Sequence, residues 1–217
     1  MNILRCPLCK GDDVEPYHQD NKREYLLCNT CHLVFVSPLF WLNAEQEKAE
    51  YDLHQNDVND QGYRKFLSRI VDPMHHIVGK GKGLDFGCGP GPALSKMFEE
   101  LGYDMDIYDP FYFADNAVFN KKYDFITATE VIEHVSEPAV FIPLLLKMIK
   151  AGGWIGLMTK LVFDKEAFAK WHYKNDQTHI CFFSKKTFEY ISEIYCLELT
   201  FIGDDVILLH KAEQRWL

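Results

Sequence analysis

Beyond residue 80, short apolar runs alternate with longer segments in which apolar residues recur at helical spacing. The short runs predict buried strands, and the longer segments predict amphipathic helices. We expect strands at 84–86, 105–109, 123–128 and 154–159, and helices over about 90–101 and 140–149, the latter ended by Gly152-Gly153. Strands that alternate with helices predict a mostly parallel α/β sheet covered on both faces.

The last part of the chain follows another pattern. Ser184 is a suitable N-cap for a helix that ends near Tyr195. Apolar runs at 197–202 and 206–210 then flank Gly203-Asp204-Asp205, which predicts a terminal antiparallel hairpin.

The first 80 residues predict smaller elements. Tyr25-Leu26-Leu27 and Leu33-Val34-Phe35-Val36 are expected to be strands, the second stopped by Pro38. Residues 43–79 begin polar and then place apolar side chains at helical spacing, which predicts helical segments.

Four cysteines form two C-x2-C pairs, Cys6 with Cys9 and Cys28 with Cys31, separated by 18 residues. This spacing is typical of a zinc site whose four thiolates form a tetrahedron with Zn–S distances of about 2.3 Å. Such a closed site has no open coordination position, so we expect a structural zinc ion that stabilises a segment too small to fold alone. A redox pair is the alternative, although such pairs normally open a helix in a thioredoxin-like context.

These patterns predict three parts: a zinc ribbon at 1–40, a helical linker or lid at 41–80, and an α/β domain at 81–217. A lid needs polar groups that meet a ligand on closure. Tyr51, His54, Asn56 and Tyr63 have that character, although solvation alone also explains them.

Composition narrows the class of protein. The 217 residues are 47% hydrophobic and 25% charged, with no apolar run near the roughly 20 residues that span a bilayer. The first residues lack a signal-peptide core, so we expect a cytoplasmic protein with no membrane partner. A net charge of −9 argues against a broad nucleic-acid-binding face. The oligomeric state stays open.

The segment Gly83-Leu84-Asp85-Phe86-Gly87-Cys88-Gly89-Pro90-Gly91 is the most informative part of the chain. A strand here ends in an acid, and three glycines then turn the chain into a helix, so that the backbone can lie against a nucleotide-like ligand. Asp109 follows Gly89 by twenty residues, at the end of the next expected strand. A carboxylate at that place can bind ribose hydroxyls.

The dinucleotide fingerprint G-x-G-x-x-G/A fails, because Pro92 stands at its third glycine position. The segment instead resembles motif I of class I S-adenosylmethionine (SAM)-dependent methyltransferases of the small-molecule type, similar to the methyltransferase-domain-23 group. The resemblance implies that the first strand's end and glycine turn, together with the end of the second strand, bind SAM: Asp85, Phe86, Gly87, Cys88, Gly89, Gly91, Asp109 and Pro110.

Two later blocks extend the resemblance over about residues 80–211. The segment 123–135 is similar to the family's motif around strand four, which implies cofactor contacts from Thr129, Glu130 and Val131. Lys150-Ala151-Gly152-Gly153-Trp154 is similar to the turn before strand five, and the terminal hairpin matches the family's antiparallel strand. Many relatives have an adenine-binding acid in a longer segment after strand two. Here Asp115 is the only candidate, and a solvated loop acid is the alternative.

Methyl transfer needs an acceptor that is held in line with the sulfonium, and some acceptors also need a proton removed. The loop Trp171–Ser184 resembles an aspartate-x-Thr-His stretch of small-molecule methyltransferases. His179 is therefore our first candidate for a general base or acceptor-orienting group, with Asp176 to orient it and His134 to organise the site. A structural histidine is the alternative for His179, and Trp171 and Tyr173 either wall the acceptor pocket or cover the core.

The resemblance favours a methyltransferase for a small-molecule acceptor, in a group that includes sugar and secondary-metabolite enzymes. The alternative is a ribosomal or transfer RNA methyltransferase whose ribbon binds RNA. The ribbon offers four basic residues, Arg5, Lys10, Lys22 and Arg23, against five acids, Asp12, Asp13, Glu15, Asp20 and Glu24, which is not a basic surface. A third class is a protein that only senses SAM.

Overall fold

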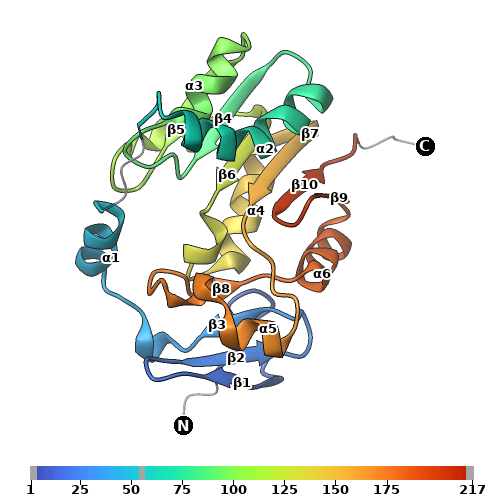
Figure 1. Cartoon of the computed structure of the whole chain (residues 1–217). Helices are drawn as coiled ribbons and strands as arrows, with labels where there is room; N and C mark the ends of the chain where they lie inside the picture. The colour runs from blue at the N-terminus through green and yellow to red at the C-terminus, as the bar shows by residue number, and fades with distance from the viewer. Residues whose placement is uncertain (1–3, 54–56, 214–217) are drawn as a thin grey trace.

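A computed structural model describes residues 4–53 and 57–213. Its larger sheet has six strands in the order β5-β4-β6-β7-β10-β9 (Figure 1). The first four run parallel, and β10 is antiparallel to both of its neighbours, β7 and β9. The strands are β4 (Lys82–Phe86), β5 (Asp104–Tyr108), β6 (Tyr123–Thr129), β7 (Ile149–Met158), β9 (Glu198–Ile202) and β10 (Val206–His210). The predicted α/β sheet with its terminal hairpin is confirmed.

Helices cover both faces of this sheet, because the strands are apolar on both sides. On β10, Val206 and Leu208 belong to one core and Ile207 and Leu209 to the other, as the period of two requires. The first core holds side chains of two helices, α2 (Gln61–Ile77) and α3 (Ala93–Glu100). The second holds side chains of α4 (Pro138–Met148) and α6 (Lys185–Tyr195). The sheet is therefore sandwiched between two pairs of helices.

Two predicted boundaries differ from the structure. Helix α3 begins at Ala93, three residues later than expected, because the chain first turns through Pro90 and Pro92. Helix α4 ends at Met148, and β7 has already begun at Ile149, so Gly152-Gly153 lies inside a strand and forms no turn before it. A Cβ on Gly153 would meet the carbonyl oxygen of Asp124 at 2.8 Å, so glycine here permits close strand packing beside a register shift.

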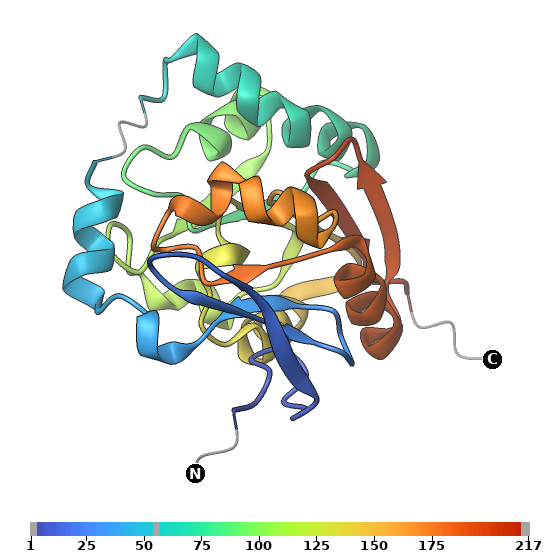
Figure 2. The same cartoon turned by 60° about the horizontal axis from the view of Figure 1, so that its bottom comes forward.

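The N-terminal ribbon is a second, four-stranded sheet in the order β1-β2-β3-β8. Strands β1 (Val14–Gln19), β2 (Glu24–Cys28) and β3 (Val34–Val36) come from the ribbon itself. The fourth strand, β8 (Cys181–Phe182), comes from the long connection after β7 and pairs with β3. Sequence patterns predicted neither β1 nor β8, and they also missed α5 (Lys165–Lys170), which packs on β1. Figure 2 shows the ribbon strands lying against this connection.

A single apolar cluster runs from ribbon residues such as Leu33 and Phe35 through Phe182 to Phe188 on α6. The ribbon and the α/β domain therefore share a core. The helix α1 (Ala44–Tyr51), capped by Asn43, stands at the side of the molecule between the ribbon and α2 (Figure 1). Short 3-10 helices occupy Pro38–Phe40, Asn116–Asn120, Ile132–His134 and His172–Asn175. Across residues 4–53 and 57–213, none of the helices has the length and apolar character needed to cross a membrane.

Candidate active site

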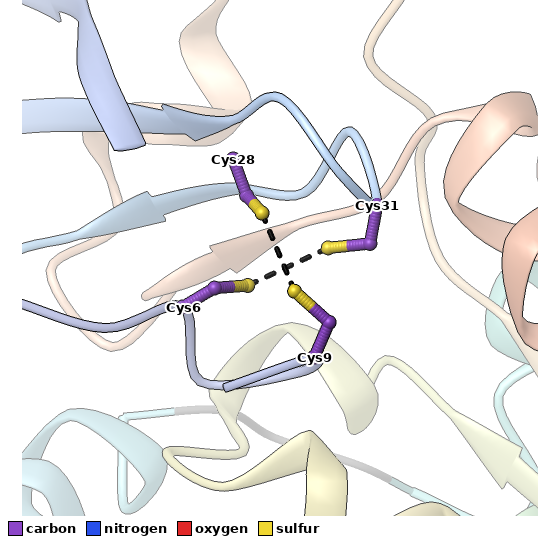
Figure 3. Close-up of side chains that lie close together, drawn as sticks. All are labelled: Cys6, Cys9, Cys28 and Cys31. Atoms are coloured by element: carbon purple, nitrogen blue, oxygen red, sulfur yellow. Dashed lines mark hydrogen bonds between the residues drawn. The ribbon is translucent and has the colours of Figure 1, made fainter. Parts of the chain in front are cut away.

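The four ribbon cysteines converge on one point (Figure 3). The Sγ atoms of Cys6 and Cys31 are 3.4 Å apart, as are those of Cys9 and Cys28, and all four atoms lie within 4.8 Å of one another. All four cysteines are free thiols, and Cys6, Cys28 and Cys31 are fully buried. Four sulfurs from two tight turns fit the donor set and size of a tetrahedral zinc site.

A separate cavity of about 480 Å³ lies at the carboxyl ends of β4, β5 and β6, where an open α/β sheet binds its ligand. Among the predicted cofactor residues, all but Gly91 line it: Asp85, Phe86, Gly87, Cys88, Gly89, Asp109, Pro110, Thr129, Glu130 and Val131. The three predicted catalytic residues, His134, Asp176 and His179, line it as well. Asp115 lies outside this cavity, and its side chain instead caps the 3-10 helix that follows it.

The glycine turn is shaped by close packing. Gly87 has φ +74°, and a Cβ there would lie 2.4 Å from Cγ2 of Val131. Only glycine fits that place without displacing the chain. Gly89 also has positive φ, and its N–H donates to Oδ2 of Asp109 at 3.0 Å. The turn is therefore fixed against both β5 and the segment after β6.

Asp109 holds more of the backbone than the sequence indicated. Its Oδ1 accepts hydrogen bonds from the N–H groups of Phe111 (2.9 Å) and Tyr112 (3.2 Å), in addition to the bond from Gly89. The carboxylate thus ties the loop after β5 to the glycine turn while still lining the cavity. Asp85 is 2% exposed, and burial raises the pKa of its carboxyl group to about 7.

Two glutamates after β6 form a buried acidic network that sequence patterns did not predict. Tyr173 donates a short hydrogen bond to Glu133, and its hydroxyl is 3.2 Å from Oε2 of Glu130 and 3.3 Å from Oγ1 of Thr159. Burial raises the pKa of Glu130 to about 7 and that of Glu133 to about 8. Glu130 has φ +52°, an unusual conformation for a residue with a side chain. Tyr173 therefore holds the two glutamates by hydrogen bonds from outside the cavity. Neither Tyr173 nor Trp171 lines the cavity.

The two candidate histidines lie side by side, with ring centroids 4.6 Å apart. Nδ1 of His179 is 2.8 Å from the carbonyl oxygen of Tyr173, and Nδ1 of His134 is 3.2 Å from that of Thr178. A carbonyl oxygen only accepts, so each Nδ1 carries the proton and each Nε2 is the unprotonated nitrogen when the ring is neutral. Nε2 of His179 is 3.7 Å from Oδ2 of Asp176. This pair has the geometry of a potential base with an adjacent carboxylate.

Glu133, His134 and His179 also bring one potential ligand atom each within 4.8 Å of the others. Glu133 is fully buried, and its Oε2 has no hydrogen-bond partner within the described part of the chain. Titratable groups from two segments, the 3-10 helix after β6 and the loop after β7, thus gather beside the cavity.

The cover over the cavity includes residues that the sequence singled out as lid candidates. Tyr51 of α1 contacts the ring of His134 edge to face at 5.3 Å, and its hydroxyl donates to Glu47 at 2.7 Å. Tyr63 of α2 lines the cavity too, whereas His54 and Asn56 lie outside the described residues. Four aromatic side chains complete the wall without having been predicted: Phe66, Phe111, Tyr112 and Phe141. They belong to helices and loops whose apolar residues look like ordinary core in the sequence.

The charge of the cavity wall is one-sided. Five acids line the cavity, namely Glu47, Asp85, Asp109, Glu130 and Asp176. None of the lining side chains in residues 4–53 and 57–213 is a lysine or an arginine. Such a wall favours a neutral or cationic ligand over a phosphate or a carboxylate.

Residues 51–195 match the model of a family described as "Methyltransferase domain". The ubiquinone biosynthesis O-methyltransferase of Burkholderia vietnamiensis is 29% identical over 41% of this chain, and the match spans 48% of that relative. The structure of 1,6-didemethyltoxoflavin-N1-methyltransferase from Burkholderia thailandensis, with 1,6-didemethyltoxoflavin and S-adenosylhomocysteine bound, superposes with a TM-score of 0.53 at 12% identity. That superposition covers 92% of this chain and 100% of the other. A SAM-dependent methyltransferase from Archaeoglobus fulgidus gives the same TM-score at 13% identity, over 68% and 94% of the two chains.

Proposed function

The chain belongs to the methyltransferase-domain family and is a class I SAM-dependent methyltransferase, and from this premise we propose that its acceptor is a small neutral or cationic molecule bound beside His134 and His179. The proposal rests on one observation: the glycine turn and the two histidines line the same cavity. The absence of lysine and arginine from the described part of this wall argues against acceptors that carry phosphate or carboxylate groups.

SAM supplies an electrophilic methyl group on a good leaving group, so the protein has mainly to bind and align the acceptor. The glycine turn and Asp109 are assigned to the cofactor's amino-acid tail and ribose. Nε2 of His179 takes the proton of the acceptor's oxygen or nitrogen as that atom bonds to the methyl carbon and the carbon–sulfur bond breaks. Asp176 stabilises the resulting imidazolium from 3.7 Å. S-adenosylhomocysteine and the methylated acceptor are the products.

The ribbon cysteines are assigned to a structural zinc ion. Support comes from the four converging thiols, none of which lines the cavity. Four reduced thiolates suit a reducing compartment, so we place the protein in the cytoplasm. Residues 41–80 are assigned a covering role, because Glu47, Tyr51 and Tyr63 face the same cavity.

An RNA acceptor has less support. Of the four basic residues in the ribbon, Arg23 is only 4% exposed and is used internally, which leaves Arg5, Lys10 and Lys22 on the surface. The exposed acids Asp12, Asp13, Glu15 and Glu24 outnumber them. The negatively charged phosphates of RNA would therefore meet a ribbon surface that is itself mostly acidic.

The cofactor assignment is tested by calorimetric titration of the zinc-loaded protein with S-adenosylhomocysteine. We expect micromolar binding that Asp109→Asn weakens at least about tenfold, because an amide leaves one of three backbone N–H groups without its acceptor. Asp115→Asn is the matched control, since Asp115 lies outside the cavity. Absence of binding by well-folded protein would refute the assignment.

The acceptor class is tested by transfer of labelled methyl groups from SAM into separate pools of amines, neutral hydroxyl compounds, phosphorylated compounds and RNA. We expect products in the first two pools only. His179→Gln should lower kcat about 100-fold while the affinity for S-adenosylhomocysteine stays within about twofold. Labelling confined to RNA or phosphorylated compounds would overturn the proposed acceptor class.

A further inference from the structure

The loop that carries Asp176 and His179 is held from outside the cavity by one buried ribbon side chain. Arg23 lies at the turn between β1 and β2, more than 150 positions earlier in the chain, and is 4% exposed. Its Nη1 donates to the carbonyl oxygen of Gln177 at 3.0 Å, and its Nη2 donates to those of Lys174 and Asp176, both at 2.5 Å. Three carbonyl oxygens of four consecutive residues are therefore bound by a single guanidinium group.

Two other carbonyl oxygens of this loop point to the histidines of the cavity. Those of Tyr173 and Thr178 meet Nδ1 of His179 and of His134. The backbone is thus oriented on one side by the ribbon and on the other by the two rings. Because each peptide unit is planar, binding the carbonyls at 174, 176 and 177 fixes the orientation of three peptide units in this loop.

The arginine is itself rigidly placed. Its Nε donates to the hydroxyl of Tyr25 at 3.0 Å, and that hydroxyl donates to Oδ2 of Asp20 at 3.0 Å. The same carboxylate oxygen is 3.0 Å from Nζ of Lys174, which is only 6% exposed. Asp20 also accepts hydrogen bonds from the backbone N–H groups of Lys22 and Arg23, so the hairpin turn and the loop share one network.

The ribbon also holds the far end of the loop. The N–H of Val36 donates to the carbonyl oxygen of Ile180 at 2.9 Å, and β3 then pairs with Cys181 and Phe182. His179 is therefore placed between two attachments to the same small sheet. Arginine suits the first attachment because its five N–H donors form a planar fork that lysine cannot reproduce.

We propose that Arg23 is a positioning residue of the methyltransferase, through which the zinc ribbon sets the geometry of the loop Tyr173–His179. The inference rests on the proposed function, because it assigns that loop to the acceptor. It gives the ribbon a role that needs no contact with substrate or nucleic acid.

The first test is hydrogen–deuterium exchange of zinc-loaded protein for wild type, Arg23→Met, Arg23→Lys and Lys22→Met. Lys22→Met is the matched control, because Lys22 is exposed and its substitution removes the same charge from the same turn. We expect amides at 174–179 to exchange at least about tenfold faster in Arg23→Met, and Arg23→Lys to restore only part of the protection. Peptides at 85–91 and the Lys22→Met protein should behave like wild type. Unchanged exchange at 174–179 in folded Arg23→Met would overturn the proposal.

The second test separates positioning from plain stability. At a temperature where every variant is folded and retains its zinc, we expect Arg23→Met to lower kcat about 30- to 100-fold for the acceptor found by the labelling screen. The affinity for S-adenosylhomocysteine should stay within about twofold. A loosened loop with wild-type kcat would overturn the proposal, whereas loss of cofactor binding by wild type would refute the proposed function instead.

Should Arg23→Met fail to fold, Tyr25→Phe provides the same test with less disturbance. It keeps the buried ring and removes the hydroxyl that holds Nε of Arg23 and that also bonds Asp20 and, at 3.2 Å, the carbonyl oxygen of Lys174. We expect faster exchange at 174–179 and a kcat lowered about threefold to tenfold. Wild-type values for both measurements would overturn the proposal.

Discussion

The two ends of the cavity are built in different ways. The end that we assign to the cofactor is centred on a backbone turn, with Gly87 and Gly89 between β4 and α3. The end that we assign to the acceptor consists of side chains from separate segments, including Tyr51, His134 and His179. A backbone site depends on local conformation, whereas a side-chain site depends on whatever holds its segments together.

The acceptor end depends on the ribbon. Its loop is attached at Arg23 and again through β8, and both attachments lead to strands that the four cysteines join. The glycine turn of the cofactor end is held instead by Asp109 and by packing against Val131. Damage to the ribbon should therefore separate the two ends functionally, and damage to the glycine turn should do the reverse.

The largest functional separation between the two ends of the cavity is expected from Cys28→Ser. Removing one thiolate should release the zinc ion, whose binding contributes on the order of 10 kcal/mol in small zinc domains. We expect loss of bound metal, faster exchange at 173–182 and no measurable methyl transfer, with the affinity for S-adenosylhomocysteine lowered less than about tenfold. Metal analysis, exchange and calorimetry measure the three effects.

The control for that experiment is Cys196→Ser, because Cys196 is exposed at the end of α6 and far from the cluster in sequence. It should leave all three measurements unchanged. If Cys28→Ser abolished cofactor binding as completely as catalysis, the two ends would not be separable and the comparison would fail.

The reverse separation is expected from Gly87→Ala. The added Cβ would meet Val131 at 2.4 Å and would force a side chain into φ +74°. Affinity for S-adenosylhomocysteine should fall at least about 100-fold, while exchange at 174–179 stays at its wild-type rate. Gly102→Ala is the control: φ is +88° there, but nothing lies within 4 Å of the added atom. It should cost about 1 kcal/mol of stability and leave binding intact, and equal binding by both variants would contradict the role of the turn.

The sequence predicted these two ends unequally for the same physical reason. The glycine turn, the acid at 109, the cap at Ser184 and the terminal hairpin are local, so their residue types alone indicated them. The cysteine spacing was equally direct, and its thiols converge as predicted. Gly152-Gly153 was misassigned because a strand that needs close packing has the same glycines as a turn.

Long-range partners had no such signal. Nothing in the spacing of Arg23 and Gln177 indicates that they are hydrogen-bonded, since they lie 154 positions apart. The two residues of β8 are too short an apolar run to be read as a strand without the ribbon beside them. Tyr173 looked as much like pocket wall as core, and only its bond to Glu133 assigns it to the support of the site.

The last prediction concerns how stability depends on pH. It tests the network of Glu130, Glu133 and Tyr173 behind the acceptor end. Burial raises the pKa of Glu133 to about 8, above its ordinary value near 4.5. A carboxyl group with a raised pKa in the folded protein favours folding while it is protonated, so its contribution is complete below about pH 4.5. That contribution is lost as the pH rises from about 4.5 through 8, because the unfolded chain releases its proton in this range whereas the folded protein retains it.

Glu133→Gln keeps the shape of the side chain and an oxygen that accepts from Tyr173, but it cannot ionise. The zinc-loaded wild type should therefore lose on the order of 4 kcal/mol more stability than the variant between pH 5 and pH 8.5, measured by urea unfolding. Some pH dependence should remain in the variant, since burial also raises the pKa of Glu130 to about 7. The exposed Glu193→Gln is the control and should follow wild type. Parallel curves for wild type and Glu133→Gln would mean that Glu133 titrates in its ordinary range, and the acceptor end would then rest on an ionised network rather than a protonated one.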